Sequence, residues 1–321
     1  MKTRHLQIIA VVSSLILLIL VAGISIHNGE IKETTQPQET EAVDVNGGEF
    51  VEIKQVEGQK AQDIKASYDV YNNKVDVDLG IYDDKYNENC IKNGSPYVDK
   101  FKIIKKSKNT HIIIDLEELC GYTTFVKNNC LYLHFESVES TDKKVIVIDA
   151  GHGGSDVGAA SGSTYEKDIN IDVARYVKQK LYKNYLVLFT RDGDSLPSVE
   201  ERADFVNKIR PKAFVSIHCN DSDVDLATGI EVLYNQSDSR KHGSKWLADK
   251  ILKNIIETTN AKNRGLVYGR EIHIVRHSKV PVALVELGFM SNTDEVKKLK
   301  SKTYQKKCAA GIANAIEEAI K

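Results

Sequence analysis

VIVIDAGHGG, at residues 145–154, is a continuous apolar run that breaks into glycine around a single histidine, His152. An apolar, β-branched run bounded by glycine predicts a buried strand of a parallel sheet, with a sharp turn at the carboxyl end of the strand. Ligands of open α/β sheets bind at that edge. His152 is therefore a candidate ligand or acid/base group. A lone histidine at a strand end is more often structural, so this interpretation needs partners elsewhere in the chain.

The composition excludes some classes of function. The 321-residue chain carries 44 basic and 45 acidic residues, so no overall electrostatic field favours nucleic acid as a partner. Its five cysteines are too few for a disulfide scaffold, and no CxxC pair indicates a thiolate zinc site. If the chain is exported, Cys120 and Cys130 are placed to pair across a hairpin. The alternative is that all five are free, small apolar residues.

The N-terminal part has the pattern of an export signal. Lys2 and Arg4 precede an uncharged segment, residues 6–26, whose length suits the ~20 residues of a membrane-spanning helix. We expect a signal anchor at residues 1–27, with the N-terminus in the cytoplasm and the remainder extracytoplasmic. The alternative is a signal peptide cleaved after the small residues 21–23, which would release the protein to the cell wall. Residues 28–49 are polar and aperiodic, typical of a flexible linker.

Two folded parts follow. Residues 50–139 alternate apolar and polar residues in short pieces separated by turns, which predicts a small β-rich module. Residues 140–321 alternate strands with helices, the pattern of an α/β domain. We expect a mostly parallel, twisted sheet of about six strands flanked by helices. The expected strands are 145–150, 185–190, 213–218, 229–234, 272–276 and 282–286, and the expected helices are 168–181, 198–209, 239–257, one begun by Asn292, and one from 301 to 320.

Polar side chains stand where several of these strands end. His152 follows the first strand, and His218 and Glu286 end two others; Glu166 lies in the loop before the first helix. If the strands run parallel, these side chains converge on one edge of the sheet. Two histidines and a carboxylate are a catalytic zinc ligand set that leaves a position for water, and a further carboxylate can serve as base. From chemistry alone, the roles of the carboxylates remain open among four residues, which are Glu166, Glu286, Asp149 and Asp156.

From about residue 145 to the C-terminus, the chain resembles the zinc-dependent N-acetylmuramoyl-L-alanine amidases that hydrolyse peptidoglycan. The matching segments are VIDAGHGG (147–154), EKD (166–168), TRD (190–192), SVEER (198–202), SIHCN (216–220), GIE (229–231), RG (264–265) and VELGFMSN (285–292). The resemblance implies zinc on His152, Glu166 and His218, with Glu286 as the catalytic carboxylate. The bond cleaved would join the lactyl group of N-acetylmuramic acid to L-alanine, which makes residues 140–321 the zinc amidase catalytic domain.

The resemblance also bears on supporting residues and partners. Asn220 and Arg264 match recurrent family positions and are expected to have a supporting role, whereas Arg191 and Arg202 are expected to hold strand and helix together. Relatives switched by partner proteins carry a long helical insert that plugs the zinc site, but here Tyr234 is followed by a short connection. We therefore expect no plug and no obligate protein partner. The expected partners are peptidoglycan and, through the N-terminal helix, the membrane.

The β-rich module loosely resembles the β-sandwich localisation domains that precede the catalytic domains of some cell-wall amidases, and a generic spacer is the alternative. Three other functions compete with the amidase interpretation. A nucleotide-binding protein is excluded, because residues 151–158 lack the glycine spacing of a dinucleotide fingerprint and no Gly-Lys-Ser/Thr is present. A zinc peptidase of other specificity and a catalytically silent cell-wall binding protein remain as alternatives.

Overall fold

The computed structural model describes residues 49–57, 59, 63–105, 108–224 and 226–320. The expected signal anchor at residues 1–27 and all but the last residue of the expected linker lie outside the described residues. Within the described ranges, none of the helices combines the length and the apolar character that a membrane crossing requires.

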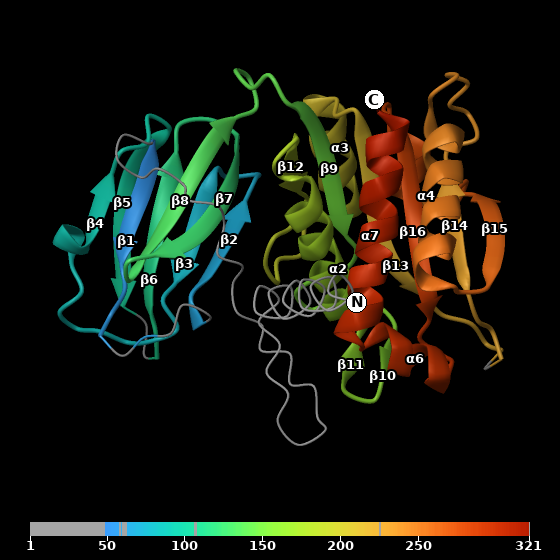
Figure 1. The fold of residues 1–321 in the computed structure, drawn as a ribbon, viewed down its shortest axis with the longest axis horizontal. Helices are drawn as coiled ribbons and strands as arrows, with labels where there is room; N and C mark the ends of the chain where they lie inside the picture. The colour runs from blue at the N-terminus through green and yellow to red at the C-terminus, as the bar shows by residue number, and fades with distance from the viewer. Residues whose placement is uncertain (1–48, 58, 60–62, 106–107, 225, 321) are drawn as a thin grey trace, which may run out of the picture. The chain divides into compact units, whose positions relative to one another are not determined.

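Residues 50–137 form two four-stranded antiparallel sheets, in the orders β4-β1-β8-β7 and β2-β3-β6-β5 (Figure 1). The strands are β1 (Phe50–Lys54), β2 (Lys65–Asp69), β3 (Lys74–Asp78), β4 (Ile91–Asn93), β5 (Val98–Lys105), β6 (Thr110–Leu116), β7 (Cys120–Lys127) and β8 (Cys130–Ser137), with a 3-10 turn at Glu88–Cys90. Alternate residues point inward, so that Val75 and Val77 of β3 share one core with Ile112 and Ile114 of β6 and with Leu133 of β8. Burying each of these side chains contributes roughly 1.5–3 kcal/mol before the loss of conformational entropy.

The second part is built on a six-stranded sheet in the order β12-β9-β13-β16-β14-β15. Its strands are β9 (Lys144–Ala150), β12 (Tyr185–Phe189), β13 (Ala213–Asn220), β14 (Ile230–Tyr234), β15 (Asn263–Tyr268) and β16 (Val282–Phe289). β12, β9, β13 and β16 run parallel, whereas β14 is antiparallel to β16 and parallel to β15. The prediction of a mostly parallel sheet of about six strands is confirmed.

Helices cover both faces of this sheet. They are α2 (Glu166–Leu181), α3 (Val199–Ile209), α4 (Ser244–Thr259), α5 (His273–His277), α6 (Thr293–Leu299) and α7 (Lys302–Ala319). Ile146 and Ile148 of β9 pack in one core with α2, α4 and α7, while Val147 points to the opposite face, where α3 and α5 lie. A capping box at Ser198 opens α3, and Asn292 caps α6 through the backbone N–H groups of Asp294 and Glu295.

Two element assignments were wrong. Residues 272–276, expected as a strand, lie mostly in the short helix α5, and the sixth strand is β15 instead. A five-residue segment with three apolar residues fits either structure, because its periodicity is too short to distinguish them. β15 escaped prediction because it is an edge strand with no buried residue, so it carries little apolar signal.

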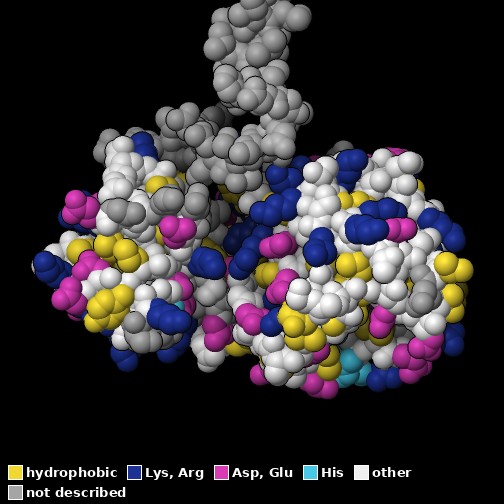
Figure 2. Space-filling model, turned by 90° about the horizontal axis from the view of Figure 1, so that it is seen from below, with side chains coloured by type: hydrophobic (Ala, Val, Ile, Leu, Met, Phe, Trp, Pro, Cys, Tyr) yellow, Lys and Arg dark blue, Asp and Glu magenta, His cyan; other side chains and the backbone are white. Residues whose placement is uncertain are grey.

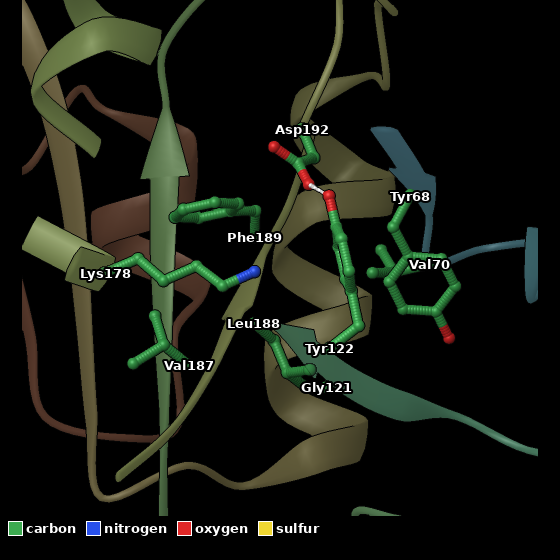
Figure 3. A pocket seen from close by; sticks show the side chains of 9 residues that line it. All are labelled: Tyr68, Val70, Gly121, Tyr122, Lys178, Val187, Leu188, Phe189 and Asp192. Atoms are coloured by element: carbon green, nitrogen blue, oxygen red, sulfur yellow. Dashed lines mark hydrogen bonds between the residues drawn. The ribbon is translucent and has the colours of Figure 1, made fainter. Parts of the chain in front are cut away.

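The β-rich module and the α/β domain contact each other through buried groups. Gly121 of β7 lies so close to Leu186 of β12 that an added Cβ would stand 2.3 Å from its Cδ1. The hydroxyl of Tyr122 donates a hydrogen bond to the Asp192 carboxylate, and the Lys178 ammonium lies 4.1 Å from the centroid of the Tyr122 ring (Figure 3). Burial raises the pKa of Asp192 and lowers that of Lys178, and the opposite charge of each partner counteracts that shift.

The cysteines are free throughout. Cys120 and Cys130 do not form the disulfide considered above, because the register of β7 and β8 pairs Cys120 with Ser137 and Cys130 with Lys127. The two thiols therefore lie at opposite ends of the same hairpin, and most of the five cysteines are buried packing residues.

Candidate metal centre

His152 stands directly after β9 in a left-handed backbone conformation, with φ of 62°. This conformation is uncommon for a residue with a side chain and stores strain where it occurs. Neighbouring segments hold it in place. The Gly151 N–H donates to the Ile217 carbonyl at 3.0 Å, and the Arg202 guanidinium donates to the His152 carbonyl at 2.8 Å. The turn therefore aims the imidazole across the carboxyl ends of the strands, which point toward the β10–β11 hairpin (Ala160–Ser161 and Thr164–Tyr165; Figure 1).

The expected convergence at this edge occurs. β9, β13 and β16 are adjacent and parallel, and His218 and Glu286 are direct partners in the register of β13 and β16. His152, Glu166 and His218 each offer a ligand atom, and these atoms lie within 4.8 Å of one another. Among the residues that the structure describes, this is the one such group of three or more. Glu166 is not in a loop, as the sequence suggested, but is the first residue of α2.

Glu166 is the centre of the group. Its carboxylate is 3.2 Å from His152 Nε2 through one oxygen and 3.0 Å from His218 Nδ1 through the other. It also accepts hydrogen bonds from the backbone N–H groups of Ala159 and Cys219, both at 2.9 Å. Burial by itself raises the pKa of Glu166, but both imidazoles outweigh it and hold that pKa well below its usual range. Glu166 is therefore a fixed anion.

A second carboxylate orients His152. Asp156 lies 2.8 Å from His152 Nδ1, which leaves Nε2 facing the group. Metal-binding histidines commonly have such a partner on the other ring nitrogen, because it fixes the tautomer and the ring orientation. Burial lowers the pKa of His152, but Glu166 and Asp156 outweigh it and raise that pKa to about 9. Asp156 was one of four carboxylates whose roles the sequence left open, and the structure places it against His152, on the ring nitrogen away from Glu166.

Two glycines provide the space that this group needs. A Cβ on Gly151 would stand 2.3 Å from His218 Nε2, and a Cβ on Gly158 would stand 2.5 Å from a Glu166 carboxylate oxygen. No real Cβ makes contacts that short, so a side chain at either position would displace a member of the group. The glycines therefore make room for the ligand side chains.

Asp149 does not join the group. Its buried carboxylate receives hydrogen bonds from Arg202 at 2.7 Å and from Ser216 at 2.6 Å, and Thr190 donates to it as well. Burial raises its pKa, but Arg202 outweighs this effect and holds the pKa at about 2. Arg191 donates to the Ala150 and Gly151 carbonyls. The two arginines thus have the scaffold role expected for them, and Asp149 is the counterion of Arg202.

Glu286 has a different environment. One of its carboxylate oxygens is buried and has no hydrogen-bond partner among the described residues. Burial raises its pKa to about 7, with a contribution from the charges of Glu166 and Glu231. The sequence did not single out Glu231, which is the register partner of Glu286 on β14 and is bonded to Asn220 and Arg264. The only sequence signal for Glu231 was its place near the start of a strand, in the segment GIE.

Comparison with known proteins identifies the family. Residues 146–318 match the family model described as N-acetylmuramoyl-L-alanine amidase. The chain is 36% identical over 183 residues to the uncharacterized protein YqiI of Bacillus subtilis, covering 57% of this chain and 87% of YqiI. It is 32% identical to the N-acetylmuramoyl-L-alanine amidase LytC of the same organism, but over 34% of LytC and 53% of this chain.

The fold is also shared with solved structures. The catalytic domain of CwlV, an N-acetylmuramoyl-L-alanine amidase from Bacillus (Paenibacillus) polymyxa var. colistinus, superposes with a TM-score of 0.52 and 34% identity. The match covers 56% of this chain and 99% of that domain. Because the family model spans more than half of the chain and includes the whole His-Glu-His group, this chain belongs to the N-acetylmuramoyl-L-alanine amidase family.

Proposed function

We propose that the protein hydrolyses the amide bond between the lactyl group of N-acetylmuramic acid and the L-alanine of the peptidoglycan stem peptide. In this proposal, zinc binds to His152, Glu166 and His218, and Glu286 is the catalytic carboxylate. The observation that supports it most is the convergence of these three donors, beside a carboxylate of contrasting environment, within a chain of this family.

The donor set fits zinc. Two imidazole nitrogens and a carboxylate oxygen are one of the ligand sets of catalytic zinc, and Asp156 supplies the outer hydrogen bond that such sites require. The charge also fits, because Glu166 and Asp156 hold a positive charge at His152. A divalent cation would replace the proton there. When bound, zinc supplies a water of lowered pKa and polarises a carbonyl.

The remaining chemistry belongs to the chain itself. Glu286 lies beside His218 with a carboxylate oxygen that no described residue engages, so it is placed to take a proton from the attacking water. A pKa of about 7 suits a group that accepts a proton and then returns it, here to the leaving amine of L-alanine. Arg202 and Asp149 keep the turn that carries His152 in position during this cycle.

The test is digestion of purified peptidoglycan by the parent and by Glu286→Gln, with Glu257→Gln as the control. Glu257 has the same carboxylate, but its side chain is 62% exposed on α4. We expect Glu286→Gln to retain zinc and to lose activity by a factor of roughly 10²–10⁴, while Glu257→Gln remains active. Released peptides should carry a free L-alanine amino group.

Each other outcome contradicts part of the proposal. If Glu286→Gln binds zinc and cleaves as fast as the parent, Glu286 has no catalytic role. If peptides without an N-terminal L-alanine are released, the protein is a zinc peptidase of other specificity. If the parent binds zinc and peptidoglycan but releases nothing, it is a silent cell-wall binding protein.

For the N-terminal half, we propose a signal anchor at residues 1–27, a linker at 28–49 and a cell-wall localisation role for residues 50–139. The support is the basic residues ahead of an apolar segment, together with relatives named as cell wall amidases, whose substrate lies outside the membrane. Membrane fractionation and N-terminal sequencing of the mature protein would distinguish an anchored protein from a secreted one.

A further inference from the structure

Beside the metal centre, three side chains form a network that the proposed reaction does not use. The Glu231 carboxylate accepts a hydrogen bond from the Asn220 amide at 2.8 Å through one oxygen and from Arg264 Nε at 2.9 Å through the other. The Arg264 guanidinium also stacks over the ring of Phe289, with 4.7 Å between its central carbon and the ring centroid. Two independent contacts therefore fix the plane of this guanidinium.

The sheet topology places this network at the sheet edge that carries His218 and Glu286. His218, Glu286 and Glu231 are consecutive partners across β13, β16 and β14, and Glu231 is paired with Gly265, next to Arg264, on β15. Because β14 and β15 run opposite to β16, their first residues lie beside its carboxyl end. Three strand spacings of about 4.8 Å separate the backbones of His218 and β15 by about 14 Å.

The free side of the guanidinium faces solvent. Glu231 engages Nε alone, and the two terminal nitrogens of Arg264 have no acceptor among the described residues. The side chain is 32% exposed, and a Cβ added to Gly265 would meet no atom within 4 Å. A guanidinium held at Nε, with both terminal nitrogens open to solvent, matches the two oxygens of a carboxylate.

We propose that Arg264 binds a carboxylate on the peptide leaving group of the substrate, and that Glu231 is the positioning residue that orients it. The inference rests on the proposed amidase function. The distance suits it, because an extended peptide covers about 3.5 Å per residue. With the arginine side chain reaching back over Phe289, a carboxylate one or two residues beyond the scissile amide comes within its range.

The experiment compares two soluble muramoyl-L-alanyl dipeptides that differ in one group, a free carboxylate or its amide on the residue after L-alanine. We expect the parent to prefer the carboxylate, and Arg264→Gln to lose roughly 10–100-fold in kcat/KM for it. The loss should appear in KM, with kcat and the rate for the amide substrate within about threefold of the parent. Glu231→Gln should raise KM for the carboxylate substrate by a smaller factor.

Arg270→Gln is the matched control, because Arg270 is an exposed arginine beyond the opposite end of β15 that bonds Gln236. The inference is overturned if the parent does not distinguish the two substrates, or if Arg264→Gln slows both equally. A binding experiment distinguishes failure of this inference from failure of the proposed amidase function, because it needs no turnover. Calorimetry should show that Glu286→Gln binds the free acid of an L-alanyl dipeptide more tightly than its amide. The double variant Glu286→Gln/Arg264→Gln should bind the two dipeptides equally.

Discussion

Gly158 and Gly162 provide a controlled test of the metal centre. Both have left-handed backbone conformations, with φ of +67° and +60°, so an alanine at either position meets similar backbone strain of about 1–2 kcal/mol. Their surroundings differ. A Cβ on Gly158 would stand 2.5 Å from a Glu166 oxygen and 2.7 Å from His152 Cδ2, whereas a Cβ on Gly162 meets nothing within 4 Å. The pair therefore separates backbone strain from displacement of the ligands.

The magnitude follows from linkage between zinc binding and folding. Zinc at 100 times its dissociation constant stabilises the folded protein by about 2.7 kcal/mol. If the displaced Glu166 weakens zinc binding by about 100-fold, the same zinc concentration stabilises Gly158→Ala by only about 0.4 kcal/mol. At roughly 2–4 °C per kcal/mol, the zinc-induced rise in Tm falls from about 5–10 °C to about 1 °C.

The assay is thermal unfolding of the parent and both variants, with and without zinc. Without zinc, both variants should lose Tm through backbone strain, and Gly158→Ala should lose more because its Cβ also displaces Glu166. With zinc, only Gly158→Ala should lose the zinc-induced rise. An equal zinc-induced rise in Gly158→Ala and Gly162→Ala would refute the reasoning, because it would show that Glu166 and His152 do not hold the metal in the arrangement described.

Three further predictions follow from the contacts of single side chains. Asp156→Asn should weaken zinc binding by roughly 10–100-fold, measured by competition with a chelator, and an unchanged affinity would contradict its orienting role. The pKa of Asp149 is lowered from 3.8 to about 2 in the folded protein. Ionised Asp149 therefore contributes about 2 kcal/mol to the free energy of unfolding above pH 4, and this contribution is lost as pH falls through 2. The free energy of unfolding, measured with urea, should vary less with pH in Asp149→Asn than in the parent. Tyr122→Phe should cost about 1–3 kcal/mol by leaving Asp192 without its donor, whereas Tyr82→Phe, at an exposed position, should cost nothing measurable.

The sequence predicted the convergence of His152, His218 and Glu286 at one sheet edge, because two local signals coincide there. Apolar runs located the strands, and the polar residue that ends each run located His218 and Glu286. The same reasoning failed at residues 272–276, where the run was too short to distinguish a strand from a helix. The role of Asp156 was also missed, because the turn that carries its side chain back to His152 depends on glycine conformations that composition alone does not specify.

The contact between the β-rich module and the α/β domain lay beyond sequence reasoning for a different reason. Tyr122 and Asp192 are 70 residues apart and meet only when β7 lies against β12. Neither residue breaks the local pattern in a way that indicates a partner. Because Asp192 is buried and Lys178 half-buried at this contact, the module packs against the α/β domain there. Removing residues 50–139 would expose these charges together with the apolar face of the sheet that packs with the module.

The proposed division of roles between two glutamates follows from their different hydrogen-bond donors. Glu166 and Glu286 have the same side chain and lie at the same sheet edge. Glu166 receives two backbone N–H groups and faces two imidazoles, which keep it ionised, so it is suited to hold a cation permanently. Glu286 has a buried oxygen without a donor and a pKa of about 7, so it is suited to gain and lose a proton. Environments that push the pKa values of neighbouring carboxylates apart assign one to binding and the other to catalysis.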